Sequence, residues 1–499
     1  MISSTAGVVV DREATAQAQY ASERIAHWDS IAATRPGEPF WPRYYHQRVR
    51  AVYGTVVAPG LRVLEIGCGR GDLLASLQPA AGIGIDFSAN MIAQARQAHP
   101  PLTFVRADAH QLPLLKSVDV VILSDLVNDL RDVQTVFEAV HRVLAPRGRV
   151  ILNFYSRMWQ APLGLVRRLG LANPCLPQNW LTSEDVVNLL RLADFEVVRN
   201  WAEVICPLPL PGVASVCNRF LARLWPFRLG ALTNFIIARP TPGSEKGTGP
   251  LNARVLSPFR SPKVSVIVPA RNEAGNIKAV FDRLPRMGRE TELVFVEGHS
   301  TDDTGARIEQ EIASHPAWSC QLLRQTGKGK GDAVRLGFAR ATGDVLMILD
   351  ADLTVPPEDL PRFYEALVAG KGDFVNGVRL VYPMERSAMR FLNLIGNKFF
   401  SLAFSWLLGQ PVKDTLCGTK VLWKRDYERI AANRHYFGDF DPFGDFDLLF
   451  GAAKQTLKIV DLPIRYRERT YGTTNIQRWR HGWLLLRMVL FAARSLKFV

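Results

Sequence analysis

Two series of short apolar runs alternate with helical patterns along the chain. In the first series, the apolar and β-branched runs cover residues 62–67, 82–86, 103–108, 118–125 and 148–154. In the second series, they cover residues 263–270, 292–298, 321–325, 344–352 and 373–379. Apolar strands that are separated by helices are typical of a parallel, doubly wound sheet. The pattern therefore predicts an α/β protein with two such sheets.

A segment rich in Pro, Gly and Ser, residues 241–262, separates the two series. Such a composition is typical of a linker. The 499 residues also exceed what one hydrophobic core usually holds. We therefore predict a first domain over residues 1–240, a linker over 241–262, and a second domain over 263–499 that ends in an amphipathic helix. The two halves share no obvious motif, which indicates a fusion and not an internal repeat.

The charge of the chain adds information about its partners. A formal net charge of +14 and a pI of about 9.7 suit polyanions such as nucleic acid, anionic lipid headgroups or phosphate-bearing substrates. The six cysteines form no CxxC pair, which indicates free thiols in a reducing compartment. The first residues lack the pattern of a secretory signal, and no run of about 18 uninterrupted apolar residues occurs. We therefore expect a cytoplasmic protein.

A glycine-rich loop follows the first apolar run. The segment VLEIGCGRGDLL places Gly67, Gly69 and Gly71 at a predicted strand-to-helix turn, with the acidic Glu65 just before them. Glycine lets the backbone approach a ligand closely, and a helix N-terminus favours negative charge. This loop is consistent with nucleotide binding, and by itself it does not distinguish one nucleotide cofactor from another.

Two later positions narrow the interpretation. Asp86 ends the second strand, where a carboxylate can accept two ribose hydroxyls, and Asp108 ends the third. Together these residues resemble class I S-adenosylmethionine-dependent methyltransferases over roughly residues 40–240, with a Rossmann-like sheet. The resemblance implies that the glycine loop holds the methionine part of the cofactor, Asp86 the ribose and Asp108 the adenine amine. It also implies that Ser124 and Asp125 border the methyl group.

The methyl acceptor has no signature in the sequence. Asn128, Asp129 and Tyr155 are candidates for its side of the site, and each is equally plausible as an ordinary polar loop residue. The alternative for the whole domain is a Rossmann-like sheet that binds another nucleotide, or none. Methyl transfer depends mainly on alignment of the reacting atoms, so there is no universal catalytic residue to look for.

An acidic pair ends the most apolar run of the second series. Asp350 and Asp352 in ILDADL are spaced i, i+2, so in a regular strand they would share a face. Two carboxylates close together are costly unless a cation neutralises them. Their oxygens suit Mg²⁺ or Mn²⁺ that bridges a diphosphate. A solvated acidic turn is the alternative, and it fits poorly after such an apolar strand.

Four motifs in order resemble family 2 glycosyltransferases of the GT-A fold over about residues 263–475. They are VSVIVPARNEAGNI, FVEGHSTDDT, the glycine-rich GKGKGD and ILDADL. The most similar members are the dolichyl- or polyprenyl-phosphate mannose and glucose synthases. The resemblance implies that Pro269, Asn272 and Glu273 line the site of a nucleotide-sugar donor, and that the acidic pair holds the metal.

The same resemblance places Lys328 and Lys330 in a loop near the nucleotide. The sequence also departs from the family pattern. Glu297 and Gly298 stand where the family usually has two aspartates, which affects base and sugar preference, and we keep Glu297 as a donor-binding candidate. Thr354 replaces the usual Gln after the acidic pair.

A second acidic segment, FGDFDPFGDFDLLF, follows downstream. Asp445 falls where many inverting members carry a general base, which would take the proton of an acceptor hydroxyl. A phosphate acceptor is already anionic and needs no base. Asp439, Asp441 and Asp447 are near enough to leave the choice open, and Asp445 could instead be a helix cap.

Three arginines alternate in RYRERTYGTTN. Arg465, Arg467 and Arg469 would share one face of an extended segment, which suits bidentate phosphate binding. The segment resembles the region of polyprenyl-phosphate enzymes that meets the acceptor phosphate, except that Thr474 and Asn475 replace Ser and Lys. The alternative is a solvated strand edge.

Two segments predict peripheral membrane contact. In the first, polar residues recur every three or four positions at Arg390, Asn393, Asn397, Ser401 and Ser405. In the second, basic residues cluster at Arg480, Arg487, Arg494 and Lys497. Amphipathic helices of this kind can lie in a headgroup layer. Packing against the sheet or between protomers is the alternative.

The sequence therefore predicts a bifunctional enzyme on the inner face of the membrane. It would transfer sugar with inversion from a nucleotide-diphosphate sugar to a polyprenyl-phosphate or other lipid-linked acceptor, using Mg²⁺ or Mn²⁺, and transfer methyl groups from S-adenosylmethionine in the same pathway. A glycosyltransferase with a non-catalytic scaffold domain is one alternative. A nucleic-acid-modifying methyltransferase is another, although no RNA-binding module is recognisable, and we expect no nucleic-acid partner. A processive polysaccharide synthase is disfavoured because NIQRW only approximates QxxRW and no spanning helix is predicted.

Overall fold

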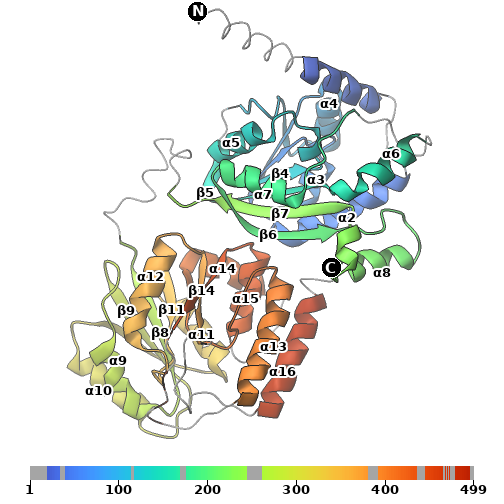
Figure 1. Cartoon of the computed structure of the whole chain (residues 1–499). Coiled ribbons are helices and arrows are strands. Elements are labelled where there is room, and N and C mark those ends of the chain that lie inside the picture. Colours follow the sequence, from blue (N-terminus) through green and yellow to red (C-terminus); the bar gives the residue numbers. More distant parts are fainter. Residues whose placement is uncertain are drawn as a thin grey trace, which may run out of the picture. The chain divides into compact units, whose positions relative to one another are not determined.

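The structure is a computed structural model that describes residues 19–33, 40–113, 117–168, 176–243, 261–379, 391–434, 444–464, 467, 469, 471 and 478–494. The described residues divide into two compact units, the first over residues 19–243 and the second over residues 261–494 (Figure 1). Each unit contains one seven-stranded sheet with helices around it, which confirms the predicted α/β fold class. The bounds of the linker, 241–262, stay a prediction.

The first unit begins with a helix over residues 19–33. Its strands are β1 (Arg62–Ile66), β2 (Ala81–Asp86), β3 (Thr103–Arg106), β4 (Val118–Ser124), β5 (Leu144–Tyr155), β6 (Phe195–Glu203) and β7 (Thr233–Pro240). Its α-helices are α2 (Phe40–Val56), α3 (Asp72–Ser76), α4 (Ala89–Ala98), α5 (Val133–Val143), α6 (Gln160–Arg168), α7 (Ser183–Leu192) and α8 (Val213–Arg219). Short 3-10 helices include η1 (Val127–Asp129), η2 (Arg157–Trp159), η3 (Leu221–Arg223) and η4 (Phe227–Gly230).

The strand order of the first sheet is β3-β2-β1-β4-β5-β7-β6, with β7 antiparallel to both of its neighbours. Alternate residues of β1 point to opposite faces, and both faces are buried: Leu64 belongs to one core cluster and Val63 to another. Burial on both faces explains the nearly continuous apolar runs in the sequence. The order reverses between β1 and β4, and the crevice beyond the carboxyl ends of such strands is where ligands bind in open α/β sheets.

The second unit has strands β8 (Val264–Ala270), β9 (Thr291–Glu297), β10 (Ser319–Arg324), β11 (Val345–Ile348), β12 (Phe374–Val378), β13 (Lys420–Trp423) and β14 (Ile459–Pro463). Its helices are α9 (Ala274–Arg283), α10 (Thr304–Ser314), α11 (Lys330–Arg340), η6 (Pro357–Asp359), α12 (Leu360–Val368), α13 (Phe391–Leu408), α14 (Lys424–Ala432), α15 (Asp445–Lys454) and α16 (Arg478–Ala492). The strand order is β10-β9-β8-β11-β13-β12-β14, and β13 runs antiparallel to β11 and β12. The reversal between β8 and β11 creates a second switch point.

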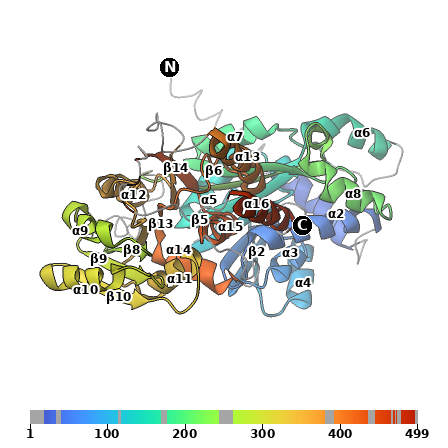
Figure 2. The same cartoon turned by 90° about the horizontal axis from the view of Figure 1, so that it is seen from below.

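Helices α13 and α16 pack against each other in the second unit (Figures 1 and 2). The hydroxyls of Ser401 and Ser405 on α13 both donate to the carbonyl of Val412, at 2.8 and 3.1 Å. The sequence pattern predicted these serines on a polar face toward the headgroups, but the structure bonds them to the protein, while Phe399 and Leu402 are exposed. Within the described part of the chain, no helix is long and apolar enough to cross a membrane.

Candidate functional sites

The glycine loop of the first unit connects β1 to α3. Gly69 and Gly71 adopt φ angles of 51° and 77°, in the left-handed region that favours glycine. A Cβ added at Gly71 would stand 2.6 Å from Cε1 of Phe104, whereas one at Gly69 would meet no heavy atom within 4 Å. The loop therefore packs closely against the domain at Gly71 and borders open space at Gly69. This open space beside partly buried backbone is suitable for the methionine part of a cofactor.

Two carboxylates, the buried Glu65 and the partly buried Asp86, form hydrogen bonds with this loop and the residues next to it. Glu65 accepts a hydrogen bond from the backbone N–H of Leu74 at 3.1 Å, and burial raises the pKa of its carboxyl to about 8. Asp86 accepts from the backbone N–H groups of Gly69 and Ser88, both at 2.9 Å. Burial also raises the pKa of Asp86, and these two hydrogen bonds oppose the rise. Backbone hydrogen bonds from the loop and from the residues next to it therefore fix the position of each carboxylate.

A small pocket opens at the carboxyl ends of β3 and β4. Its lining includes Asp108, His110 and Leu126. Asp108 accepts from the backbone N–H of His110 at 2.9 Å and lies 2.7 Å from its Nδ1, and these hydrogen bonds lower the pKa of Asp108 despite partial burial. Asp108, the residue predicted to lie beside the adenine amine, therefore borders a cavity at the same edge of the sheet as the glycine loop.

The helix over residues 19–33 covers one side of this pocket, and sequence analysis missed its role. Tyr20 donates through its hydroxyl to the carbonyl of Asp129 at 2.7 Å, and Arg24 donates to the same carbonyl at 3.0 Å. Tyr20 and Arg24 also line the pocket. Farther along, Asp29 accepts from the hydroxyl of Ser88, two residues after Asp86, at 2.5 Å. The local sequence of this segment does not indicate which part of the domain its helix contacts.

The end of β4 carries the predicted methyl-side residues. Ser124 is the last residue of the strand, and Asp125 follows with a φ of 53°, which is strained for a residue with a side chain. Asp125 accepts from the hydroxyl of Tyr45 at 2.8 Å and from the amide of Asn153 at 2.6 Å. Burial raises its pKa to about 6. Among the residues predicted to border the methyl group, Asp125 is therefore the one whose pKa is clearly raised.

Asn128, a sequence candidate for the acceptor side, has a structural role instead. Its fully buried amide donates to the carbonyl of Asn179 at 2.7 Å and accepts from the backbone N–H of Tyr155 at 2.8 Å. These bonds join three segments of the unit. They leave its side chain directed into the protein.

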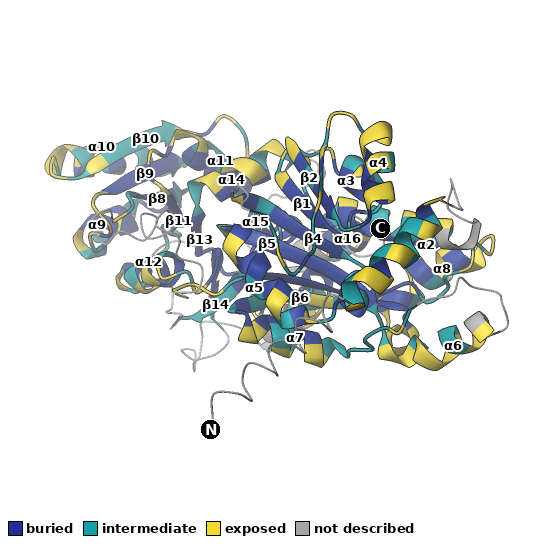
Figure 3. Ribbon diagram, turned by 90° about the horizontal axis from the view of Figure 1, so that it is seen from above, coloured by how far each residue is buried: buried dark blue, intermediate teal, exposed yellow. Residues whose placement is uncertain are grey.

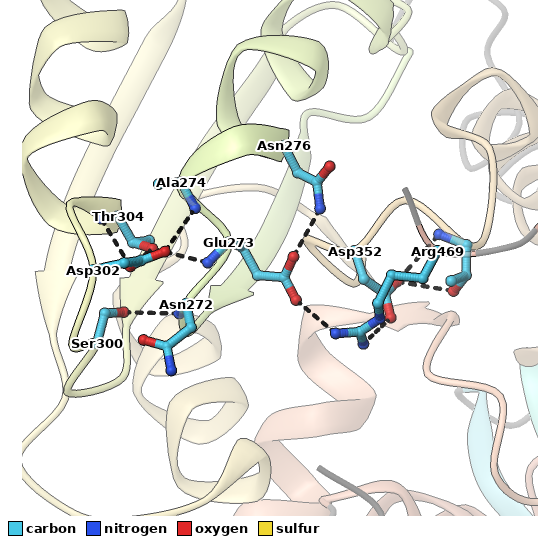
Figure 4. A network of polar contacts seen from close by, with 10 residues as sticks. Asn272, Glu273, Ala274, Asn276, Ser300, Asp302, Thr304, Asp352 and Arg469 are labelled. Atoms are coloured by element: carbon cyan, nitrogen blue, oxygen red, sulfur yellow. Dashed lines mark hydrogen bonds and ion pairs between the residues drawn. The ribbon is translucent and has the colours of Figure 1, made fainter. Parts of the chain in front are cut away.

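In the second unit, the loop after β9 clamps the turn after β8 (Figure 4). The backbone N–H of Asn272 donates to Ser300 Oγ at 3.1 Å, and that of Glu273 donates to Thr304 Oγ1 at 2.9 Å. Asp302 accepts from the backbone N–H of Ala274 at 3.3 Å. The motif HSTDDT was quoted in the sequence analysis, but these side chains were not recognised as the supports of the donor-site turn.

Carboxylates from two strand ends meet one arginine beside this turn (Figure 4). Arg469 donates to Glu273 Oε1 at 3.1 Å and to Asp352 Oδ2 at 2.6 Å. Burial raises the pKa of Glu273 to about 7, with Asp352 and Asp350 adding to the rise and Arg469 opposing it. The sequence predicted Arg469 as a ligand for the acceptor phosphate; in the structure it bridges the predicted donor and metal sites.

Asp350 has a separate basic partner. Lys330, at the start of α11, lies with its Nζ 2.5 Å from Asp350 Oδ1. Burial would raise the pKa of Asp350, but the charge and hydrogen bond of Lys330, with Lys420 and Arg379, hold it below its ordinary value. A Cβ at Gly418 would overlap both the Asp350 carboxylate and the Lys330 ammonium group, so this backbone packs directly on the ion pair.

The other predicted residues of the second unit are more dispersed. Pro269 lies on β8, and Glu297 ends β9 and accepts from the backbone N–H of Ser300 at 2.6 Å. Lys328 is exposed in the loop before α11. Arg467 is exposed and donates through its backbone to the carbonyl of Thr354 at 2.9 Å.

Thr354, which departs from the family pattern, donates through its hydroxyl to Asp352 Oδ1 at 2.8 Å and so orients that carboxylate. Arg465 lies outside the described residues.

The start of α15 lies beside the start of α11. A Cβ at Gly444 would stand 2.6 Å from Cα of Gly331, so the backbone that carries Asp445 is close to Lys330. Asp447 is buried and lies 3.5 Å from Arg335 and 3.4 Å from Arg434, which gives it a structural role.

The side chain of Asp445, together with Asp439 and Asp441, lies outside the described residues. Asp445 as a general base therefore stays a prediction.

No group of three or more His, Cys, Asp or Glu side chains is arranged to hold a metal within the described ranges. Asp350 and Asp352 nevertheless provide suitable ligands for a hard cation, because carboxylate oxygens at a strand end can share it with a ligand's diphosphate. In this structure, basic side chains compensate both carboxylates instead. A cation would therefore have to replace Arg469 at Asp352.

Comparison with protein families matches one segment in each unit. The model for "Glycosyl transferase family 2" matches residues 265–430, and the model for "Methyltransferase domain" matches residues 64–152. The chain carries a methyltransferase domain and a family 2 glycosyltransferase domain. The resemblances stated from the motifs are therefore confirmed at the level of the two domains.

Named relatives match the glycosyltransferase half. A dolichol-phosphate mannosyltransferase from Pyrococcus furiosus is 38% identical over 43% of this chain and 59% of its own length. An undecaprenyl-phosphate 4-deoxy-4-formamido-L-arabinose transferase from Klebsiella pneumoniae is 31% identical over 42% of this chain and 61% of its own length. The chain thus spans about three fifths of these relatives. A solved S-adenosylmethionine-dependent methyltransferase from Mesorhizobium loti is 24% identical over 38% of this chain and 95% of that chain, with a TM-score of 0.31.

The raised pKa of Glu65 predicts a pH dependence of stability. Because its folded value of about 8 exceeds the ordinary 4.5, the protonated side chain contributes stability that is fully present below the ordinary value and is lost as the pH rises to about 8. Glu65→Gln keeps an acceptor for Leu74 and cannot ionise. Between these pH values, the wild-type chain should lose unfolding free energy relative to the variant, by up to about 1.4 kcal/mol per pH unit.

Denaturation of the full chain at several pH values, followed by hydrogen exchange of β1, measures this difference. Asp119→Asn, at an exposed ion pair with Arg62 on the same sheet, serves as a control that should show no such trend. A constant difference between wild type and Glu65→Gln across the range would contradict a buried, protonated Glu65.

Proposed function

We propose that the chain is a bifunctional enzyme: its second unit transfers a sugar from a nucleotide-diphosphate donor to a polyprenyl-phosphate acceptor, and its first unit transfers a methyl group from S-adenosylmethionine in the same pathway. The observation that carries the sugar-transfer proposal is the cluster of Glu273, Asp350 and Asp352 with Lys330 and Arg469 at the switch point of the second sheet. Carboxylates and basic groups held together can bind a cation and a diphosphate at one place.

The donor would bind across the ends of β8, β9 and β11. Asn272 and Glu273 are fixed by the loop after β9, so the turn is organised before a ligand arrives. Lys330 would meet donor phosphate at the N-terminus of α11, where backbone N–H groups also favour negative charge. A divalent cation at Asp350 and Asp352 would supply charge compensation for the leaving diphosphate. Organised donors and charges of this kind reduce the reorganisation that transfer requires.

The acceptor class is inferred from the relatives and from the surface. The relatives' names state dolichol phosphate and undecaprenyl phosphate, and Arg467 and Arg469 lie beside the acidic pair where an acceptor phosphate would attack. Trp483, Arg487 and Leu490 on α16 and Arg494 just after it are all exposed. Their spacing of three to four residues forms one stripe of apolar and basic side chains, which suits a headgroup layer.

Methyl transfer is supported by the glycine loop, by Asp86 behind it and by the pocket at Asp108. The residues fit the cofactor because the loop has open space at Gly69 while its supporting carboxylate is fixed. Asp125, with a pKa of about 6, is ionised in most molecules at neutral pH and could accept a proton from a methyl acceptor. A scaffold domain without turnover is the competing function for this unit.

Asp352→Asn should abolish metal-dependent donor binding. The matched control is Arg469→Ala, which breaks the same ion pair but keeps the carboxylate. Calorimetry with UDP and GDP, with and without Mn²⁺, should show metal-enhanced binding in wild type and Arg469→Ala and none in Asp352→Asn. Equal metal dependence in all three proteins would show that Asp352 is not a metal ligand.

Asp86→Asn should weaken binding of S-adenosylmethionine by about ten- to a hundredfold, as expected for lost hydrogen bonds to a charged group. Asp119→Asn, at a partly exposed aspartate on the same sheet, should leave the affinity unchanged. Titration calorimetry of the folded chain tests both. Tight cofactor binding that is insensitive to Asp86→Asn would place the ribose elsewhere, and no binding to wild type would exclude the methyltransferase function.

Asp445→Asn distinguishes the two acceptor chemistries. General-base catalysis contributes roughly 10²–10⁴-fold, so a hydroxyl acceptor predicts a loss of that size. A phosphate acceptor is already ionised, and for it we expect donor binding and rate within about tenfold of wild type. Transfer assays with a polyprenyl phosphate and with a polyprenol-linked sugar, both compared with Asp447→Asn as a structural control, decide between them. A large loss with the phosphate substrate would contradict the proposed acceptor role.

A further inference from the structure

Much of the connection between β6 and β7 in the first unit is exposed (Figure 3), and many of its exposed residues are large and apolar. We refer to this feature as the 208–229 surface. Its exposed members are Leu208, Leu210, Val213, Val216, Phe220, Leu224, Trp225, Phe227 and Leu229. Trp225 alone is 74% exposed. Scattered exposed apolar residues are ordinary, but a contiguous group of this kind marks an interaction surface.

Helix α8 shows that this exposure is built into the fold. Its buried positions are the small Ala214 and the polar Asn218, one helical turn apart. Val213, Val216 and the following Phe220 face outward. A helix that served only to cover the domain would bury its large apolar residues, so the orientation is the reverse of the usual one.

The segment is also held firmly in this orientation. Asn218 accepts from the backbone N–H of Cys206 at 2.8 Å, donates to its carbonyl at 2.6 Å, and donates to the hydroxyl of Tyr44 at 3.1 Å. Arg223 is buried and forms an ion pair with buried Glu203. Trp159 donates through Nε1 to the carbonyl of Gly230 at 3.0 Å. The polar residues and backbone groups of the segment therefore hold it to the domain, and its large apolar side chains face outward.

The charged residues within the segment itself are all basic. No Asp or Glu occurs between residues 204 and 243, whereas Arg219 and Arg228 are exposed within the segment. Behind it, Glu203 is surrounded by Arg48 and Arg223, and Arg199 interacts electrostatically with both members of the Glu203–Arg223 pair. Three arginines against one glutamate leave two positive charges in excess at this place. The surface therefore combines apolar and aromatic side chains with a positive potential.

We propose that the 208–229 surface docks the methyltransferase unit on an anionic lipid bilayer. Tryptophan and phenylalanine suit the boundary between headgroups and acyl chains, and nearby arginines are attracted to anionic lipid. This docking surface lies in a different unit from the α16 stripe and does not depend on the acceptor of the sugar-transfer reaction. A protein partner or a second copy of the chain would need acidic groups to match the arginines.

The test uses the full chain and vesicles of phosphatidylcholine with or without phosphatidylglycerol. Hydrogen exchange is measured peptide by peptide, so that contact by the second unit is distinguished from contact by the first. With phosphatidylglycerol present, amides of residues 208–229 should exchange at least severalfold more slowly, and phosphatidylcholine alone should have a smaller effect. Unchanged exchange at residues 208–229 while the chain is bound to vesicles would overturn the proposal.

The matched variants are Val216→Ser combined with Phe220→Ser, and Leu192→Ser as the control. Leu192 lies on α7 of the same unit and is 49% exposed, close to the 51% of Val216. The double variant should lose the lipid-induced protection and weaken vesicle binding by about tenfold or more, as expected for two apolar side chains removed from the bilayer. Leu192→Ser should do neither. Equal loss in both variants, or protection that rises with chain concentration without lipid, would reject the bilayer as the occupant.

Discussion

Both candidate sites depend on one constraint, which is that carboxylates at the ends of buried parallel strands must be compensated. The first unit does this mainly with backbone N–H groups: Leu74 serves Glu65, while Gly69 and Ser88 serve Asp86. The second unit uses side-chain cations, Lys330 at Asp350 and Arg469 at Asp352. Without these partners, the burial of the protonated Glu65 carboxyl and of the aspartates would oppose folding at the edge of the sheet to which we assign ligand binding. The site geometry is thus also a requirement of stability.

The sequence predicted the parts of this arrangement that follow local rules. The apolar runs marked strands buried on both faces, and glycines and acids at their ends marked the turns, because a strand end and its loop are encoded within a few residues. The pairing of Arg469 with Glu273 joins positions far apart in the chain, and no local pattern records such a contact. The support of the donor-site turn by Ser300 and Thr304 was missed for the same reason.

Orientation was the other feature that the sequence could not provide. Periodicity shows that a helix has two faces, but not which face meets the protein. Ser401 and Ser405 of α13 bond inward to Val412, and Asn218 of α8 bonds inward to Cys206. In each case, polar groups satisfy backbone groups of a neighbouring loop, and large apolar side chains are left in water. The need to satisfy buried backbone groups can therefore decide the orientation of a short helix against its apolar residues.

The compensation in the second unit also links ligand binding to charge. Arg469 contacts two carboxylates, so its position depends on whether Glu273 is ionised. Because the pKa of Glu273 is about 7, the charge of this side chain changes with pH near neutrality. A divalent cation at Asp352 would repel Arg469, while a phosphate nearby would attract it. The arginine can thus exchange a carboxylate for a phosphate without leaving the site. Under the proposed function, the guanidinium that pairs with carboxylates in the ligand-free cluster would bind phosphate once the ligand is present, because its planar geometry fits both anions.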